Sequence, residues 1–103
     1  MSDINAVTHV KNARGNTWCM DSQFLHWLYR TLPVYKEEAD KVIDLEYNTI
    51  TVKGEVYTQR EAIDKMLELL EYVLSHEPHK KKVRKKTRRL LRIWTEVFPY
   101  MWW

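Results

Sequence analysis

The chain has 103 residues, of which 45% are hydrophobic and 30% charged, and its formal net charge is +3. This length corresponds to one domain with room for one small core, and the composition excludes a disordered chain. The single cysteine, Cys19, excludes an internal disulfide framework and is typical of a reducing compartment, so we expect a cytoplasmic protein. The N-terminus lacks an apolar stretch and no apolar run approaches ~20 residues, so we expect neither a secretory signal nor a transmembrane helix. We also expect no membrane partner, because the apolar face of residues 83–98 is predicted to pair with residues 63–74.

The first part of the chain predicts two short helices. Residues 1–20 show no strong periodicity and are predicted to be irregular or short extended structure. Asp21 is a favourable N-cap, and the apolar side chains after it predict a helix over residues 21–32. Pro33 limits the continuation of that helix and suits the first turn of another, so a second helix is predicted over residues 33–43.

Residues 44–57 change to a hydrophobic period of two, which predicts a small β-ribbon of two or three short strands. Asn48 and the pair Lys53-Gly54 supply two candidate turns. Because an isolated hairpin is only marginally stable, we expect this ribbon to pack against helices.

The clearest predicted element is a helical hairpin over residues 58–98. Thr58 and Glu61 have the spacing of a capping box at its start, and Pro78 suits the first turn of its second helix. The short connection between the two helices favours antiparallel packing. The predicted facing pairs are Val73 with Val83, Met66 with Leu90, and Ile63 with Trp94.

Together these elements predict a mainly helical α+β domain over residues 1–103 that ends in an aromatic tail, residues 99–103. The apolar stripes of the predicted helices define its expected core. The expected core residues are Phe24, Leu28, Ile63, Met66, Leu70, Val73, Val83, Leu90, Trp94 and Val97, with Trp27 as a further candidate.

Charge is unevenly distributed along the chain. Residues 1–32 carry three basic and two acidic side chains, a net +1. Residues 33–77 carry five basic and eleven acidic side chains, a net −6, whereas residues 78–103 carry nine and one, a net +8. Such asymmetry indicates that the last quarter of the chain has a polyanionic partner or an acidic counterpart.

In the predicted second helix of the hairpin, most of the basic side chains point away from the core. A solvated face neutralised by acids of the preceding helix is the simplest interpretation, but only Asp64 and Glu71 are placed to reach flanking cations. The remaining cations form a candidate binding surface for nucleic acid or an acidic partner. Its predicted members are Lys81, Lys85, Arg88, Arg89 and Arg92, with Lys82 and Arg84 nearer the flanks.

Three functional hypotheses follow from this pattern. The leading one is a small non-catalytic protein that contacts DNA, RNA or a nucleic-acid-processing complex, with counterion release as the source of affinity. An alternative is a protein–protein modulator or inhibitor of phage or mobile-element type, anchored on a larger enzyme by Tyr100, Trp102 and Trp103. A second alternative is a homo-oligomer in which the acidic segment of one copy meets the basic segment of another.

Candidate catalytic and metal-binding residues are few. His76 and His79 are three residues apart, but two ligands do not form a metal site, and Cys19 is the only thiol. The chain contains no phosphate-binding glycine loop and no nucleophile elbow. We therefore expect no enzymatic activity, no metal and no cofactor.

Overall fold

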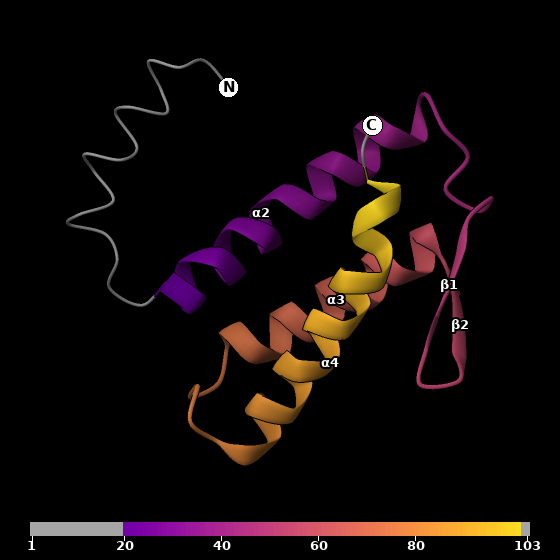
Figure 1. The fold of residues 1–103 in the computed structure, drawn as a ribbon. Coiled ribbons are helices and arrows are strands. Elements are labelled where there is room, and N and C mark those ends of the chain that lie inside the picture. The colour runs from indigo at the N-terminus through magenta and orange to yellow at the C-terminus, as the bar shows by residue number, and fades with distance from the viewer. Residues whose placement is uncertain (1–19, 102–103) are drawn as a thin grey trace.

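The computed structural model describes residues 20–101 (Figure 1). Within this range the protein is mainly helical with one two-stranded antiparallel sheet, in agreement with the predicted α+β class. The irregular segment predicted over residues 1–20 lies outside the described range except for its last residue. In chain order the described elements are α2 (Met20–Asp40), β1 (Thr49–Val52), β2 (Glu55–Thr58), α3 (Gln59–Leu74), α4 (Lys81–Val97) and the 3-10 turn η1 (Phe98–Tyr100).

α2 is one helix where two were predicted, because it continues through Pro33. Proline removes one helical hydrogen bond and crowds the preceding turn, at a cost of about 3 kcal/mol in a helix interior. The ring of Pro33 lies on the exposed side of α2, and burial of one continuous apolar stripe outweighs the defect. The residues of this stripe, on both sides of the proline, are Leu25, Leu28, Leu32 and Ala39.

The β-hairpin is shorter than the predicted ribbon, because most of residues 41–48 form turns rather than strand. β1 and β2 pair antiparallel around Lys53 and Gly54, whose φ angles are +51° and +81°. Positive φ at both central residues is the turn geometry that matches the right-handed twist of a hairpin. Ile50 and Val52 are buried and β1 packs on α4, so the hairpin rests on a helix as expected.

α3 begins at the predicted capping box. The Thr58 hydroxyl accepts a hydrogen bond from the Glu61 backbone N–H, and the Glu61 carboxylate accepts one from the Thr58 N–H. α4 begins at Lys81 rather than Pro78, because a turn closed by the Lys80 N–H and the Glu77 carbonyl comes first. α3 packs more extensively on α4 than on any other element, and the two helices cross while running in opposite directions (Figure 1).

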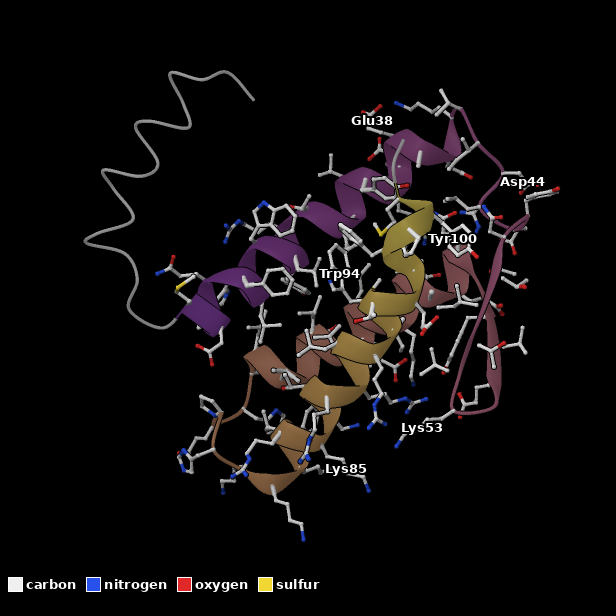
Figure 2. The ribbon with its side chains drawn as sticks, viewed as in Figure 1. Glu38, Asp44, Lys53, Lys85, Trp94 and Tyr100 are labelled. Atoms are coloured by element: carbon white, nitrogen blue, oxygen red, sulfur yellow. The ribbon has the colours of Figure 1, made fainter. Side chains whose placement is uncertain are left out.

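The core lies between the three helices and β1. The prediction was wrong for three residues, since Phe24 and Trp94 are only half-buried and Trp27 is 47% exposed. The buried face of α4 includes Ile93, which was not predicted, and Trp94 instead turns toward α2 and contacts Phe24 (Figure 2). The predicted core residues that are buried are Leu28, Ile63, Met66, Leu70, Val73, Val83, Leu90 and Val97. The individual facing pairs between α3 and α4 stay a prediction.

Candidate polyanion-binding site

A row of basic side chains runs along the exposed side of α4. Its members are three or four residues apart, so helical geometry places them on one face, opposite the buried Val83 and Leu90. At 1.5 Å per residue the row extends about 16 Å along the helix axis. We call it the basic ridge, and it consists of Lys81, Lys85, Arg88 and Arg92.

The ridge forms one wall of a surface depression of about 600 Å³ whose lining is entirely cationic. The opposite wall comes from the turn of the β-hairpin, which brings Lys53 to the side of α4 on which the ridge lies (Figure 2). Within the described part of the chain no acidic side chain lines this depression. Its lining residues are Lys53, Lys81, Lys82, Lys85, Lys86, Arg88, Arg89 and Arg92.

Lys53 was not predicted as a site residue. Its position at the tip of a hairpin could be predicted from the Lys53-Gly54 pair, which favours a tight turn. The helix face that this tip meets depends on how β1 packs against α4, and no local sequence pattern carries that information. Lys86 was likewise not among the predicted site residues, and it lines the depression as well.

The ridge is not neutralised by neighbouring acids. Among residues 20–101 no carboxylate forms an ion pair with a ridge residue or with the turn lysine. Asp64, which was expected to reach flanking cations, pairs instead with Lys36 of α2 at 2.6 Å. Glu68 lies 3.4 Å from Lys65 within α3. No described carboxylate is therefore close enough to a ridge cation to form an ion pair with it.

Arg89 connects α4 to the hairpin rather than joining the ridge. Its Nη2 lies 3.2 Å from Oε2 of Glu55 and 3.1 Å from the hydroxyl oxygen of Tyr57, both on β2. The Tyr57 hydroxyl in turn donates a hydrogen bond to Glu55. We call these three residues the Arg89 tether. Because the tether holds β2 against α4, it also positions the turn that carries Lys53.

The charge states within the tether support one another. The pKa of Glu55 is lowered, first by the hydrogen bond from Tyr57 and then by the charge of Arg89. Tyr57 can donate this hydrogen bond only while its phenol is neutral, so the bond raises the pKa of Tyr57. The hydrogen bond that Arg89 donates to the Tyr57 hydroxyl raises the pKa of Arg89. At neutral pH the carboxylate is thus ionised and the phenol protonated, which is the state that makes every hydrogen bond of the tether.

The flanking cations have separate environments. Lys82 and Lys86 lie over the ring of Tyr72, with their Nζ atoms 5.6 and 4.8 Å from its centroid. Such cation–π contacts hold the two side chains along the α3 side of the depression. Arg84 lies on the other flank, where it lines a shallow pocket with Asp21 of α2. Of the seven basic residues predicted for the binding surface, Arg84 is therefore the one outside the depression.

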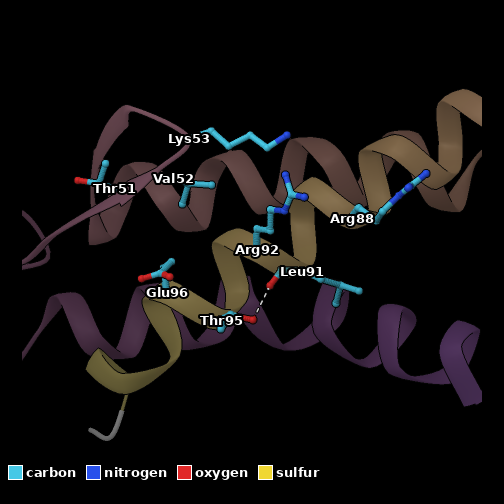
Figure 3. A pocket seen from close by; sticks show the side chains of 8 residues that line it. All are labelled: Thr51, Val52, Lys53, Arg88, Leu91, Arg92, Thr95 and Glu96. Atoms are coloured by element: carbon cyan, nitrogen blue, oxygen red, sulfur yellow. Dashed lines mark hydrogen bonds between the residues drawn. The ribbon is translucent and has the colours of Figure 1, made fainter.

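A second, shallower groove continues from the depression between β1 and α4 (Figure 3). Lys53, Arg88 and Arg92 line both, and in Figure 3 the guanidinium of Arg92 points toward the hairpin that carries Lys53. Val52 and Leu91 add an apolar lining to the groove. The combined surface therefore offers cations beside apolar side chains, together with one carboxylate, that of Glu96.

The predicted aromatic anchor falls largely outside the described residues. Trp102 and Trp103 are not part of the described range, so their role stays a prediction. Tyr100 has an exposed side chain, and its backbone carbonyl accepts a 3.3 Å hydrogen bond from Nε2 of Gln59. This bond connects η1 to the start of α3.

His76 and His79 have local structural partners. His76 stacks on Tyr72 with ring centroids 3.9 Å apart, and its Nδ1 lies 2.7 Å from the Tyr72 carbonyl oxygen. Nε2 of His79 lies 3.4 Å from a carboxylate oxygen of Glu77. Among residues 20–101 no group of three His, Cys, Asp or Glu side chains could hold a metal ion. Cys19 lies outside this range.

No protein-family model, curated protein or solved structure matches this chain. Within the described range no helix is long and apolar enough to cross a bilayer.

Proposed function

We propose that this protein is a non-catalytic binding protein that holds the phosphate backbone of nucleic acid in the cationic depression beside α4. The observation that carries the proposal is the lining of that depression, which consists of eight Lys and Arg side chains and no described acid. A polyanion is the ligand chemistry that relieves such a concentration of charge. The proposal requires no cofactor and no catalytic group.

Binding through this site would work by counterion release. Each ridge cation that replaces a condensed cation at a phosphate contributes affinity without reading the base sequence. The rigid helix presents the four ridge charges at fixed spacing, and Lys53 adds a charge from the facing turn. Repulsion between cations one helical turn apart weakens α4 by tenths of a kcal/mol per pair, and a bound phosphate chain would remove that repulsion.

The proposal is tested by binding duplex DNA, single-stranded DNA and RNA of random sequence across a salt series. The ridge variant is Lys85→Gln/Arg92→Gln, which removes two exposed cations from the centre and end of the ridge. Its matched control is Arg30→Gln/Lys41→Gln, which removes the same charge from exposed positions outside the depression. Both variants have the same net charge, so any difference between them reports position.

We expect the ridge variant to lose affinity and to reduce the slope of log K against log salt by about 1.8 on duplex DNA, since each phosphate contact contributes about 0.9. The control should keep the slope of the unaltered protein. Equal behaviour of the two variants, or no binding of the unaltered protein at ~50 mM salt, would contradict the proposal. In that case an acidic protein surface becomes the candidate partner, as the modulator hypothesis requires.

A further inference from the structure

A line of four aromatic side chains crosses from α2 to the end of α4. Phe24 and Trp27 stack with centroids 6.1 Å apart, Phe24 meets Trp94 edge-on at 6.0 Å, and Trp94 lies 5.2 Å from Phe98. The two inner rings, Phe24 and Trp94, are half-buried against the core. The two outer rings are open, with Trp27 47% and Phe98 59% exposed.

This aromatic line ends beside the basic ridge. Leu91, Thr95 and Phe98 follow one another at intervals of four and three residues, so they form a row along α4 adjacent to Arg88 and Arg92. Phe98 keeps helical dihedral angles, which extends the row beyond the last residue of α4. Leu91 is exposed and lines the groove in Figure 3 together with both arginines. A row of cations and a row that contains the exposed apolar residues Leu91 and Phe98 thus run next to each other along this helix.

The two rows together fit a single strand better than a duplex. A single strand can place phosphates on a basic row while its unpaired bases stack on neighbouring aromatic rings. In a duplex the base faces are buried in the stack, and a duplex on the ridge would leave Trp27 and Phe98 unused.

The hairpin also argues against reading of duplex DNA by α4. A major groove about 12 Å wide admits one α-helix or one two-stranded ribbon. Here the hairpin turn carrying Lys53 stands beside the ridge and lines the same depression. A duplex that approached the ridge would therefore meet the hairpin turn as well as the helix.

We infer that the ligand of this surface is a single-stranded nucleic acid, with phosphates on the ridge residues Arg88 and Arg92 and bases stacked on Phe98 and Trp27. This inference rests on the proposed function and specifies its substrate class. The strand would cross α4 from the cationic depression toward α2. Its affinity would combine salt-dependent phosphate contacts with a stacking contribution that depends only weakly on salt.

The test compares a labelled 15-nucleotide strand, as DNA and as RNA, with a duplex of the same length, by fluorescence anisotropy. The aromatic variant is Trp27→Leu/Phe98→Leu, which keeps apolar side chains at exposed positions but removes both rings. Its control is Tyr47→Leu, because Tyr47 is an 80% exposed aromatic residue outside the depression and the groove. The ridge variant Lys85→Gln/Arg92→Gln is measured in parallel.

We expect the single strand to bind more tightly than the duplex, and the aromatic variant to weaken single-strand binding about fivefold or more while leaving duplex binding unchanged. In the unaltered protein the indole N–H resonance of Trp27, assigned by its loss in the variant, should shift on addition of the strand. The Tyr47→Leu control should bind both ligands normally.

Two results overturn the inference in distinguishable ways. If the duplex binds as tightly as the strand, or if the aromatic variant weakens both ligands equally or neither, single-strand recognition is wrong. The ridge variant would then still lower affinity for both ligands, and the proposed function would stand. If the ridge variant binds both ligands as tightly as the unaltered protein, the proposed function itself fails.

Discussion

Gln59 is the only buried polar or charged residue among those described, and its environment makes it a sensitive position. Nε2 of Gln59 donates hydrogen bonds of 3.3 Å to the Tyr35 hydroxyl and to the Tyr100 carbonyl. Its Oε1 is buried and has no hydrogen-bond partner among the described atoms. One side chain therefore joins α2, α3 and η1 while leaving an acceptor unsatisfied.

Gln59→Glu is expected to destabilise the protein by about 3 kcal/mol at pH 7, because full burial can raise the pKa of a carboxyl by several units. A raised pKa in the folded state means that the loss is absent below the ordinary pKa of glutamate and grows as the pH rises above it. Urea denaturation at several pH values measures this dependence. Gln59→Met is the control, with no titrating group at this position and no such dependence. A pH-independent loss in Gln59→Glu would contradict the assignment of Gln59 as buried.

The Arg89 tether gives a second prediction at the scale of single residues. Tyr57→Phe removes the hydrogen bond that is the largest cause of the lowered pKa of Glu55, so that pKa should move up toward its ordinary value. The measurement is an NMR titration of the Glu55 carboxyl carbon, with Tyr47→Phe as the control. Because the pKa of Glu55 is lowered in the folded protein, its stabilising effect is present at neutral pH and lost as the pH falls through that pKa. No change in the pKa on Tyr57→Phe would show that the tether does not persist in solution.

The ridge could be predicted from the sequence, whereas its surroundings could not. The outward positions of Lys81, Lys85 and Arg92 follow from helical periodicity, because all three are on one helix whose apolar face can be identified from the sequence. The position of Lys53 beside the ridge and the pairing of Arg89 with β2 depend on contacts between residues more than thirty positions apart. Such contacts are set by tertiary packing, so the facing wall of the depression appears only in the folded chain.

At the scale of elements, α4 lacks the usual stabilising features at its N-terminus. Lys80 is the N-cap residue and makes no side-chain capping hydrogen bond, and the first turn contains no acidic residue. Cations at a helix N-terminus also oppose the helix dipole. The uncapped, cationic N-terminus therefore lowers the stability of α4, but it places positive charge at the start of the ridge.

Lys80→Ser should therefore raise the free energy of unfolding by about 1 kcal/mol, since serine is a favourable N-cap and the substitution removes a cation next to the helix start. Lys41→Ser, an exposed lysine in the turn after α2, is the control and should have little effect. Chemical denaturation of both variants provides the comparison. A decrease in stability on Lys80→Ser would show that Lys80 contributes more than its position in the helix indicates.

α2 and α3 illustrate why predictions differ in reliability between elements. The α3 start was predicted correctly because Thr58 and Glu61 satisfy each other's backbone groups locally. The break at Pro33 was wrong because a local steric cost competes with burial along the whole of α2. Local rules therefore fix a boundary only when no long-range packing opposes them.

At the scale of the whole molecule, charge of opposite sign gathers at different ends. Figure 2 shows Glu38 and Asp44 at the end where α2 finishes, and Lys53 and Lys85 toward the other end. Several exposed acids lie near the first of these ends. They are Glu37, Glu38, Asp40, Asp44 and Glu46. Lys41 pairs with Glu38, and Arg60 pairs with Asp40 and Glu46, so these two cations offset part of the negative charge.

This separation predicts weak head-to-tail self-association at low ionic strength, because the acidic end of one copy can meet the ridge of another. Sedimentation at ~20 mM salt should show a mass that increases with protein concentration. The mass should return to that of the monomer at ~0.5 M salt, where screening reduces attraction to within a few ångströms. An excess of oligonucleotide should have the same effect by occupying the ridge. A mass that does not depend on salt excludes the homo-oligomer hypothesis.

The two-residue turn at Lys53 also has a thermodynamic consequence. Since the depression needs both this turn and α4, it exists only in the native state, and an unfolded chain offers a polycation without the facing wall. A ligand that prefers the assembled depression must shift the unfolding equilibrium by mass action. Occupancy and melting temperature are therefore linked quantities. The protein's heat resistance should follow the concentration of its ligand and fall as added salt competes for the same charges.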